Sequence, residues 1–231
     1  MTPQLIMAIV WDLDGTLIHF NIDWIRARRE TIKILKHYGV PKNLLTVKSS
    51  ILENIGLARE YFNNSGIAPE KIEKIIKKVD QVVNDIEYEA TKEAKAVNGI
   101  KEVLDYFSKK NFKQAIYTFN TYRNAKASLE KTELSQYFNV IVGRDHVKNT
   151  KPHPDHLTLI CNKLNVTPSN IIVIGDNHRD IEGALNVGAK SIAIKTNLSK
   201  LTNLEILKKA NKIIEESEIP TKLIPTIEEL L

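Results

Sequence analysis

The sequence contains very little cysteine. Of its 231 residues only Cys161 is a cysteine, which excludes an internal disulfide and gives no indication of a zinc site. Nothing near Cys161 in the sequence would lower the pKa of its thiol. We therefore expect Cys161 to be a small core residue rather than a nucleophile.

The chain also lacks a segment that would direct it to a membrane. No stretch approaches the roughly 20 apolar residues that span a bilayer. The first residues do not form a charged start followed by a long apolar stretch and a small-residue cleavage site. We therefore expect a cytoplasmic protein that does not act at a membrane.

No block of like charge is present either. The 33 basic and 28 acidic residues give a net charge of +5, but lysine and glutamate are interleaved along helical stretches. A nucleic-acid surface would need basic residues on one face, preferably with aromatic side chains, which make up only 6% of the sequence. The composition argues against a nucleic-acid partner and is compatible with an anionic small molecule.

What the chain does have is an acidic turn after a short apolar run. Residues 7–10 are consistent with a central strand covered on both faces, and Gly15 supplies the turn that ends it. Asp12 and Asp14 then lie at the carboxyl end of this strand, where open α/β sheets bind ligands. Two carboxylates so close together repel each other, so we expect a shared cation or different protonation states. A plain polar turn is the alternative, because Asp and Gly are common in turns.

A helical region follows this strand. Apolar residues recur at helical spacing over about 24–38, 44–62 and 69–94, and Pro69 opens the third stretch. We find no convincing strand within residues 19–94.

From residue 97 onward, helices and short apolar strands alternate. We expect helices over about 100–107, 125–134, 155–164 and 181–187, and strands at 114–117, 140–142, 171–174 and 191–194. This alternation is typical of a doubly wound, parallel, Rossmann-like α/β sheet. In the tail we expect a helix near 201–210, an edge strand at 212–214 and a terminal helix from Ile227.

The simplest architecture is therefore an α/β core interrupted by an α-helical insert. The core would comprise residues 1–18 and 95–231, and the helical cap would comprise residues 19–94. The cap would enter the chain just after the first strand of the core.

Polar side chains follow several of the predicted strands. Because the carboxyl ends of parallel strands lie at one edge of a sheet, we expect these side chains to meet around one crevice. They are Asp12, Asp14, Thr118, Asn120, Lys151, Asp176 and Asp180.

This set resembles the four motifs of the haloacid dehalogenase-like hydrolase superfamily, in order and at plausible spacing. The motif residues are Asp12-Leu13-Asp14-Gly15-Thr16, Thr118, Lys151-Pro152, and Gly175-Asp176 with Asp180. The position of the helical insert, between the first two motifs, is similar to that of the members with a helical cap, such as phosphoglycolate phosphatase-like enzymes.

The resemblance implies a role for each acidic residue. Asp12 would be the nucleophile that forms an aspartyl-phosphate. Asp14 would protonate the leaving alcohol and then activate water. Mg²⁺ would be held by Asp12, by the backbone carbonyl of Asp14 and by Asp176, which suits a cation that prefers oxygen ligands. Asp180 would orient Lys151 or a metal-bound water, and an amino-terminal helix cap before Ile181 is the structural alternative.

The resemblance also implies which residues bind the phosphoryl group. Thr118 and Lys151 would contact its oxygens, and Lys151 would also offset the carboxylates. Asn120 is a further candidate, although the chain departs here from the Thr-Asn sequence of many relatives because Phe119 intervenes. A second departure is His19-Phe20, where many capped members have an acidic residue beside a small one. A polar hinge residue is the favoured interpretation of His19.

We therefore predict a Mg²⁺-dependent phosphatase that acts on a small phosphorylated metabolite. A phosphomutase of the same superfamily is the main alternative, because both activities need Asp12 and Asp14. A 2-haloacid dehalogenase is disfavoured because Asp14 would have no leaving oxygen to protonate. A non-catalytic binding module on the same fold also remains open. The sequence specifies neither the substrate, nor the cap residues that select it, nor the oligomeric state.

Overall fold

The structure is a computed structural model that describes residues 6–19, 22–197 and 202–231. The chain forms two compact units. One consists of Met1–Phe20 with Ala94–Leu231, and the other of Asn21–Glu93. We call them the α/β unit and the helical unit.

The α/β unit is built on a six-stranded sheet in which every neighbouring pair is parallel. The strand order is β5-β4-β1-β6-β7-β8. The strands are β1 (Ala8–Trp11), β4 (Lys113–Tyr117), β5 (Val140–Val142), β6 (Ile171–Gly175), β7 (Lys190–Lys195) and β8 (Lys212–Glu215). The predicted doubly wound α/β fold with a helical insert is thus confirmed, with β1 at the centre of the sheet.

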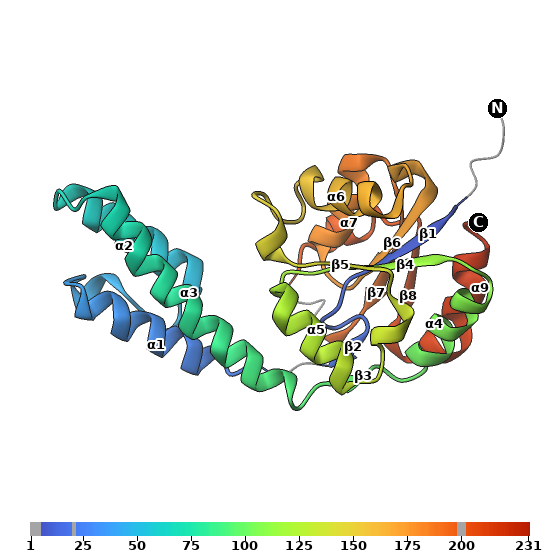
Figure 1. The fold of residues 1–231 in the computed structure, drawn as a ribbon, viewed down its shortest axis with the longest axis horizontal. Coiled ribbons are helices and arrows are strands. Elements are labelled where there is room, and N and C mark those ends of the chain that lie inside the picture. Colours follow the sequence, from blue (N-terminus) through green and yellow to red (C-terminus); the bar gives the residue numbers. More distant parts are fainter. Residues whose placement is uncertain (1–5, 20–21, 198–201) are drawn as a thin grey trace. The chain divides into compact units, whose positions relative to one another are not determined.

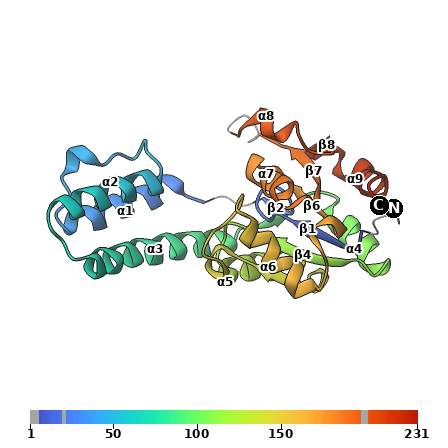
Figure 2. The same ribbon diagram turned by 90° about the horizontal axis from the view of Figure 1, so that it is seen from above.

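Side chains of β1 alternate between two hydrophobic layers, as the pleat of a buried strand requires. Ile9 and Trp11 face one layer, and Ala8 and Val10 face the other. Helices α4, α5 and α9 cover the first face, and α6 and α7 cover the second (Figures 1 and 2). Cys161 is buried on α6, and burial raises the pKa of its thiol to about 11, as expected for a core residue.

The helices of this unit follow the strands in the expected alternation. They are α4 (Ile100–Lys109), α5 (Tyr122–Lys131), α6 (Pro154–Leu164), α7 (His178–Val187), α8 (Leu204–Leu207) and α9 (Ile219–Glu228). Helix α8 is only a single turn, and residue 201, where the predicted helix begins, lies outside the described residues.

The terminal helix begins at Ile219, not at Ile227 as predicted. Pro220 is compatible with this earlier start because it occupies the first turn, where a backbone N–H has no intrahelical partner. Ile219, Leu223 and Ile227 pack into the core along one face of α9 and stabilise the helix despite Pro225 in its interior.

The helical unit contains three long helices, α1 (Trp24–His37), α2 (Ile51–Asn64) and α3 (Pro69–Thr91). Its apolar core is formed by all three helices. Helix α2 starts later than predicted, because Ser50 and Glu53 form a capping box there and Lys42–Leu44 forms a separate 3₁₀ turn. No helix in the described part of the chain has both the length and the apolar character needed to cross a membrane.

The α/β unit also contains a two-stranded antiparallel ribbon that the sequence pattern does not predict. It pairs β2 (Ile18–His19) with β3 (Lys95–Ala96), so that Ile18 lies opposite Ala96 and His19 opposite Lys95. Two-residue strands are too short to show an alternating pattern, which is why the prediction found none. The ribbon lies in the α/β unit, at the points where the chain leaves for the helical unit and returns.

A buried polar side chain ties β4 to its neighbours. The Gln114 amide accepts a hydrogen bond from the Trp11 indole N–H at 3.0 Å and donates to the Leu104 carbonyl and the Ser108 hydroxyl, both at 2.9 Å. We expect Gln114→Leu to lower the free energy of unfolding by about 1–3 kcal/mol, because it leaves the buried Trp11 indole N–H without a partner.

Urea unfolding measures this effect, with Gln136→Leu as the matched control. Gln136 is exposed, so its replacement should change the unfolding free energy by less than about 0.5 kcal/mol. Equal effects of the two replacements would contradict the assigned role of Gln114.

Candidate active site

The structure brings five polar side chains of the α/β unit to the carboxyl edge of the sheet. Asp12 directly follows β1, Thr118 follows β4, and Asp176 follows β6. Lys151 lies in the segment between β5 and α6, and Asp180 lies in the first turn of α7. Parallel neighbouring strands end together, and this places the side chains within reach of one another.

Lys151 is the central cation of the site. Its side chain is 1% exposed, and its Nζ donates to Asp12 Oδ1, to Asp180 Oδ1 at 2.6 Å and to the Tyr117 carbonyl at 2.9 Å. The three N–H donors of the ammonium group are therefore all used. Burial alone would lower the pKa of Lys151, but the two carboxylates outweigh burial and raise that pKa above its ordinary value.

Asp180 has two structural contacts at once. It is the third residue of α7, and its Oδ2 accepts a hydrogen bond from the Asn177 backbone N–H at 3.0 Å while its Oδ1 accepts from Lys151. The N-cap residue is Asn177 rather than Asp180, but the Asp180 carboxylate takes part in capping as the third residue of a capping box with Asn177. Asp180 therefore has the predicted structural role at the helix start and binds Lys151 as well. Gly175 permits this packing, because a Cβ there would overlap the Asp180 carboxylate.

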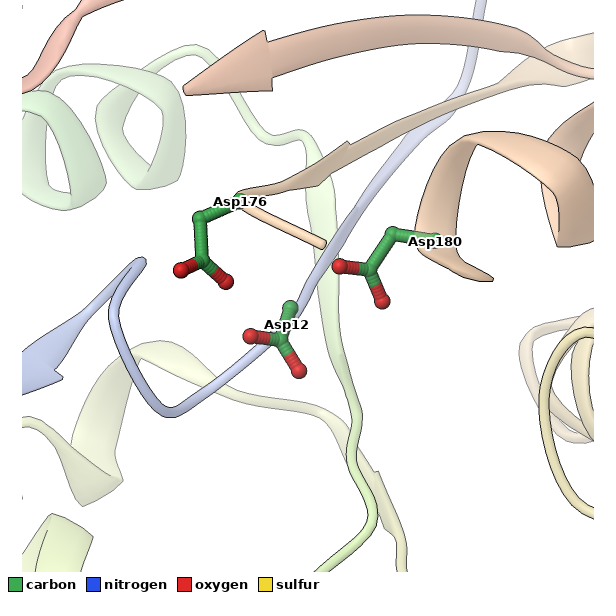
Figure 3. Close-up of side chains that lie close together, drawn as sticks. All are labelled: Asp12, Asp176 and Asp180. Atoms are coloured by element: carbon green, nitrogen blue, oxygen red, sulfur yellow. The ribbon is translucent and has the colours of Figure 1, made fainter. Parts of the chain in front are cut away.

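Three carboxylates form a cluster beside the lysine. Asp12, Asp176 and Asp180 each offer an oxygen within 4.8 Å of the others, and Figure 3 shows their carboxyl groups facing a common space. Burial raises the pKa of Asp12 to about 7 against the opposing charge of Lys151. Burial, reinforced by the charges of Asp12 and Asp180, raises the pKa of Asp176 to about 8.

The cluster fits a hard divalent cation. Both oxygens of Asp180 accept hydrogen bonds, whereas among the described residues Asp176 receives a single hydrogen bond, a long one of 3.5 Å from the Thr196 hydroxyl. Asp12 and Asp176 are therefore the side chains best able to ligate such an ion. Gly15, at φ 82°, leaves room for Asp176, because a Cβ there would lie 2.5 Å from Asp176 Oδ2. The backbone carbonyl of Asp14 stays a predicted ligand.

Asp14 lies beside this cluster and interacts with Asn120. Asp14 Oδ2 accepts a hydrogen bond from Asn120 Nδ2 at 2.6 Å. The backbone N–H of Asn120 donates to the Thr118 hydroxyl at 3.0 Å, and Thr118 is fully buried. The Asn120 amide thus orients Asp14, and its predicted contact with a phosphoryl group stays a prediction.

Other site residues were assigned no role from the sequence. The Thr16 hydroxyl lies 3.4 Å from Asp12 Oδ2, and the Tyr117 ring centroid lies 4.6 Å from Lys151 Nζ. Thr196 directly follows β7, so the signal that identified Asp12 and Thr118, a polar residue at a strand end, would have found it too. His19 lies in the ribbon, with its Nε2 3.0 Å from Glu216 Oε1, and its role as a polar hinge residue stays a prediction.

Comparison with known proteins agrees with this geometry. The family model described as haloacid dehalogenase-like hydrolase matches residues 9–194. The chain belongs to this family. The resemblance inferred from the four motifs is thereby confirmed.

Three individual relatives of this hydrolase share between 16% and 30% of its sequence. Pyrophosphatase PpaX from Bacillus thuringiensis (strain Al Hakam) is 30% identical over 203 residues, which cover 88% of the hydrolase and 89% of the relative. The beta-phosphoglucomutase of Clostridium difficile has a TM-score of 0.68 at 23% identity, covering 97% and 96% of the two chains. A predicted phosphoglycolate phosphatase from Haemophilus somnus 129pt has a TM-score of 0.61 at 16% identity, covering 95% and 98%. Both solved structures show the shared fold.

The raised pKa of Asp176 predicts how the stability of the metal-free hydrolase depends on pH. Because this pKa rises from 3.8 to about 8 on folding, the folded state retains a proton that the unfolded chain releases. That contribution to stability is present below about pH 4 and is lost as the pH rises toward 8. Asp176→Asn never ionises, so we expect it to unfold several degrees above wild type near pH 9 and at a similar temperature near pH 4.

Thermal unfolding in the presence of a chelator measures this difference. Added Mg²⁺ should raise the unfolding temperature of wild type at pH 9 and have little effect on Asp176→Asn, because the variant has lost one carboxylate ligand. If Asp176→Asn is less stable than wild type at both pH values, ionisation of the buried Asp176 carboxyl group does not destabilise the folded protein, and the prediction is wrong.

Proposed function

We propose that this hydrolase is a Mg²⁺-dependent phosphatase that acts on a small phosphorylated metabolite through an aspartyl-phosphate on Asp12. The observation that supports it most is the placement of Asp12. Its buried carboxylate lies at the end of β1, bound by the ammonium of Lys151 and beside the carboxylates of Asp176 and Asp180.

In this proposal Asp12 attacks the phosphorus atom while neighbouring residues hold the transferring group. Lys151 stays protonated, and its positive charge attracts the phosphoryl oxygens. The Thr118 hydroxyl accepts from Asn120 and keeps its own proton to donate to a phosphoryl oxygen. A bound Mg²⁺ would offset the negative charges of the phosphate and of the attacking carboxylate, with Asp12, the Asp14 carbonyl and Asp176 as its protein ligands.

Asp14 would transfer the protons. It would donate a proton to the leaving oxygen, and as a carboxylate it would then remove a proton from the water that attacks the aspartyl-phosphate. The 2.6 Å hydrogen bond from Asn120 supports this role, because it orients the Asp14 carboxyl group. Asp180 would position Lys151 through the 2.6 Å ion pair and would not touch the substrate.

We further propose that the helical unit selects the substrate. The motif residues all lie outside it, so differences in substrate among related proteins would come from this unit. A phosphomutase is the second candidate, because a beta-phosphoglucomutase shares the fold. It would return the phosphoryl group to a sugar rather than to water. In a dehalogenase Asp14 would have no leaving oxygen to protonate. In a non-catalytic binding module the candidate catalytic residues would have no function.

Hydrolysis of p-nitrophenyl phosphate tests the nucleophile and the metal together. We expect activity that requires Mg²⁺ and falls about a thousandfold or more in Asp12→Asn, because an amide cannot form the covalent intermediate. Activity that survives in a folded Asp12→Asn protein would overturn the assigned nucleophile. An inactive wild type would favour the phosphomutase, which a sugar-phosphate assay with a bisphosphate activator would then detect.

Asp14→Asn separates the two halves of the proposed reaction. The aryl leaving group departs without an acid, but hydrolysis of the aspartyl-phosphate needs the Asp14 carboxylate as a base. We expect a rapid release of about one equivalent of nitrophenol, followed by a steady rate that is about a hundredfold below wild type or lower. Asp12→Asn is the control and should show no such burst. A steady rate in Asp14→Asn close to that of wild type would exclude Asp14 as the base.

A further inference from the structure

Arg179 presents an exposed positive charge at the edge of the site. It is the second residue of α7, between Asn177, which caps the helix, and Asp180, which binds Lys151. Among the described residues, no carboxylate lies within ion-pair distance of its guanidinium, in contrast to exposed arginines such as Arg26, which pairs with Glu89 at 2.5 Å. Arg179 is therefore able to bind an anion.

Phe119 holds this guanidinium near the phosphoryl-binding residues. The Arg179 Cζ atom lies 5.4 Å from the centroid of the Phe119 ring, and Lys151 Nζ lies 5.2 Å from the same centroid. The two cations are thus separated by no more than the sum of these distances. A cation over an aromatic ring is attracted by the electrons of the ring face, so Phe119 favours this position of the arginine.

The backbone of Phe119 is itself held in place. Its carbonyl accepts a hydrogen bond from Arg144 Nη1 at 2.8 Å, and the flanking residues Thr118 and Asn120 are joined by their own hydrogen bond. Phe119 is the residue that separates Thr118 from Asn120 and departs from the usual Thr-Asn sequence. Its ring therefore has a structural consequence, which is to place Arg179.

The helix start beside Arg179 offers no competing site for an anion. The backbone N–H groups of Asn177, His178 and Arg179 donate to the side chains of Asp180, Thr202 and Asn177. The Arg179 guanidinium therefore supplies the N–H donors on this turn that can bind an anion. Its planar arrangement of N–H groups matches the oxygens of a phosphate.

We propose that Arg179 binds a second phosphate group of the substrate, so that the preferred substrates carry two phosphates. This inference rests on the proposed phosphatase function. The second phosphate would be joined to the first by an anhydride, as in pyrophosphate, or by a separate ester, as in a sugar bisphosphate. The similarity to a protein named pyrophosphatase is compatible with the first of these.

The reaction balances in either form. A bond forms between an Asp12 oxygen and the first phosphorus while the bond from that phosphorus to the leaving oxygen breaks. The leaving oxygen departs with the second phosphate or with the phosphorylated alcohol and takes the proton of Asp14. Water then releases phosphate from Asp12, with Asp14 as the base. Arg179 binds the departing part and does not react.

Steady-state kinetics with Mg²⁺ test the proposal on three substrates. These are inorganic pyrophosphate, fructose 1,6-bisphosphate and p-nitrophenyl phosphate, which has one phosphate. For Arg179→Ala we expect the ratio of kcat/KM on the better two-phosphate substrate to kcat/KM on p-nitrophenyl phosphate to fall about 10- to 100-fold, mainly through KM. Arg179→Lys should restore part of the ratio, and Phe119→Leu should lose part of it.

Lys163→Ala is the matched control. Lys163 is exposed in the last turn of α6, and its replacement removes one positive charge far from the carboxyl edge of the sheet. The ratio should not change in this variant. A wild-type preference for pyrophosphate would indicate that the two phosphates are joined by an anhydride. A preference for fructose 1,6-bisphosphate would indicate that they are separate esters.

Two results would overturn the inference. One is a wild type without preference for either two-phosphate substrate, and the other is an unchanged ratio in Arg179→Ala. If no substrate is hydrolysed, the proposed function fails separately. Calorimetric binding of pyrophosphate and of phosphate then decides the inference, since wild type should prefer pyrophosphate at least about tenfold and Arg179→Ala should not.

Discussion

The buried ammonium of Lys151 is the interaction on which the rest of the site depends. Two carboxylates, one directly after β1 and one in α7, and one carbonyl of β4 all accept its hydrogen bonds. Removing this charge would leave Asp12 and Asp180 buried without a counter-ion, which is strongly unfavourable. The Lys151 side chain therefore links three segments that are far apart in sequence and holds them together at the carboxyl edge of the sheet.

One lysine does not neutralise the carboxylates around it. Burial raises the pKa of Asp12 and that of Asp176 because the positive charge nearby is insufficient for the acids present. A bound divalent ion would remove this deficit and allow both groups to ionise together. The same shortage of positive charge explains why an additional arginine at the edge of the site would help a substrate with several negative charges to bind.

Much of the fold follows from local sequence patterns. The buried strands β1, β4 and β6 and the amphipathic helix α3 were predicted close to their observed positions, because apolar periodicity reports burial directly. The ribbon of β2 and β3 was missed since its strands are too short to have a period, and α9 was placed too late because its start depends on packing of Ile219 and Leu223 against the core.

The candidate site was predicted as a set of residue types at strand ends, and the structure brings those residues together. Their individual contacts did not follow from the sequence. That Asn120 binds Asp14, and that the Phe119 ring lies close to both Lys151 and Arg179, depends on the directions of side chains after β4. Such directions are set by tertiary packing, which a linear motif does not contain.

The ribbon of β2 and β3 has a consequence for how this architecture can change. Because Ile18 pairs with Ala96, the points at which the chain leaves the α/β unit and returns to it are neighbours. An inserted segment whose ends already meet closes a loop at an entropic cost that grows only slowly with its length. Helices can therefore be lengthened, lost or exchanged between these two points while the registers of the six-stranded sheet are unaffected. The ribbon thus provides a fixed attachment point at which helical inserts of different length can be accommodated.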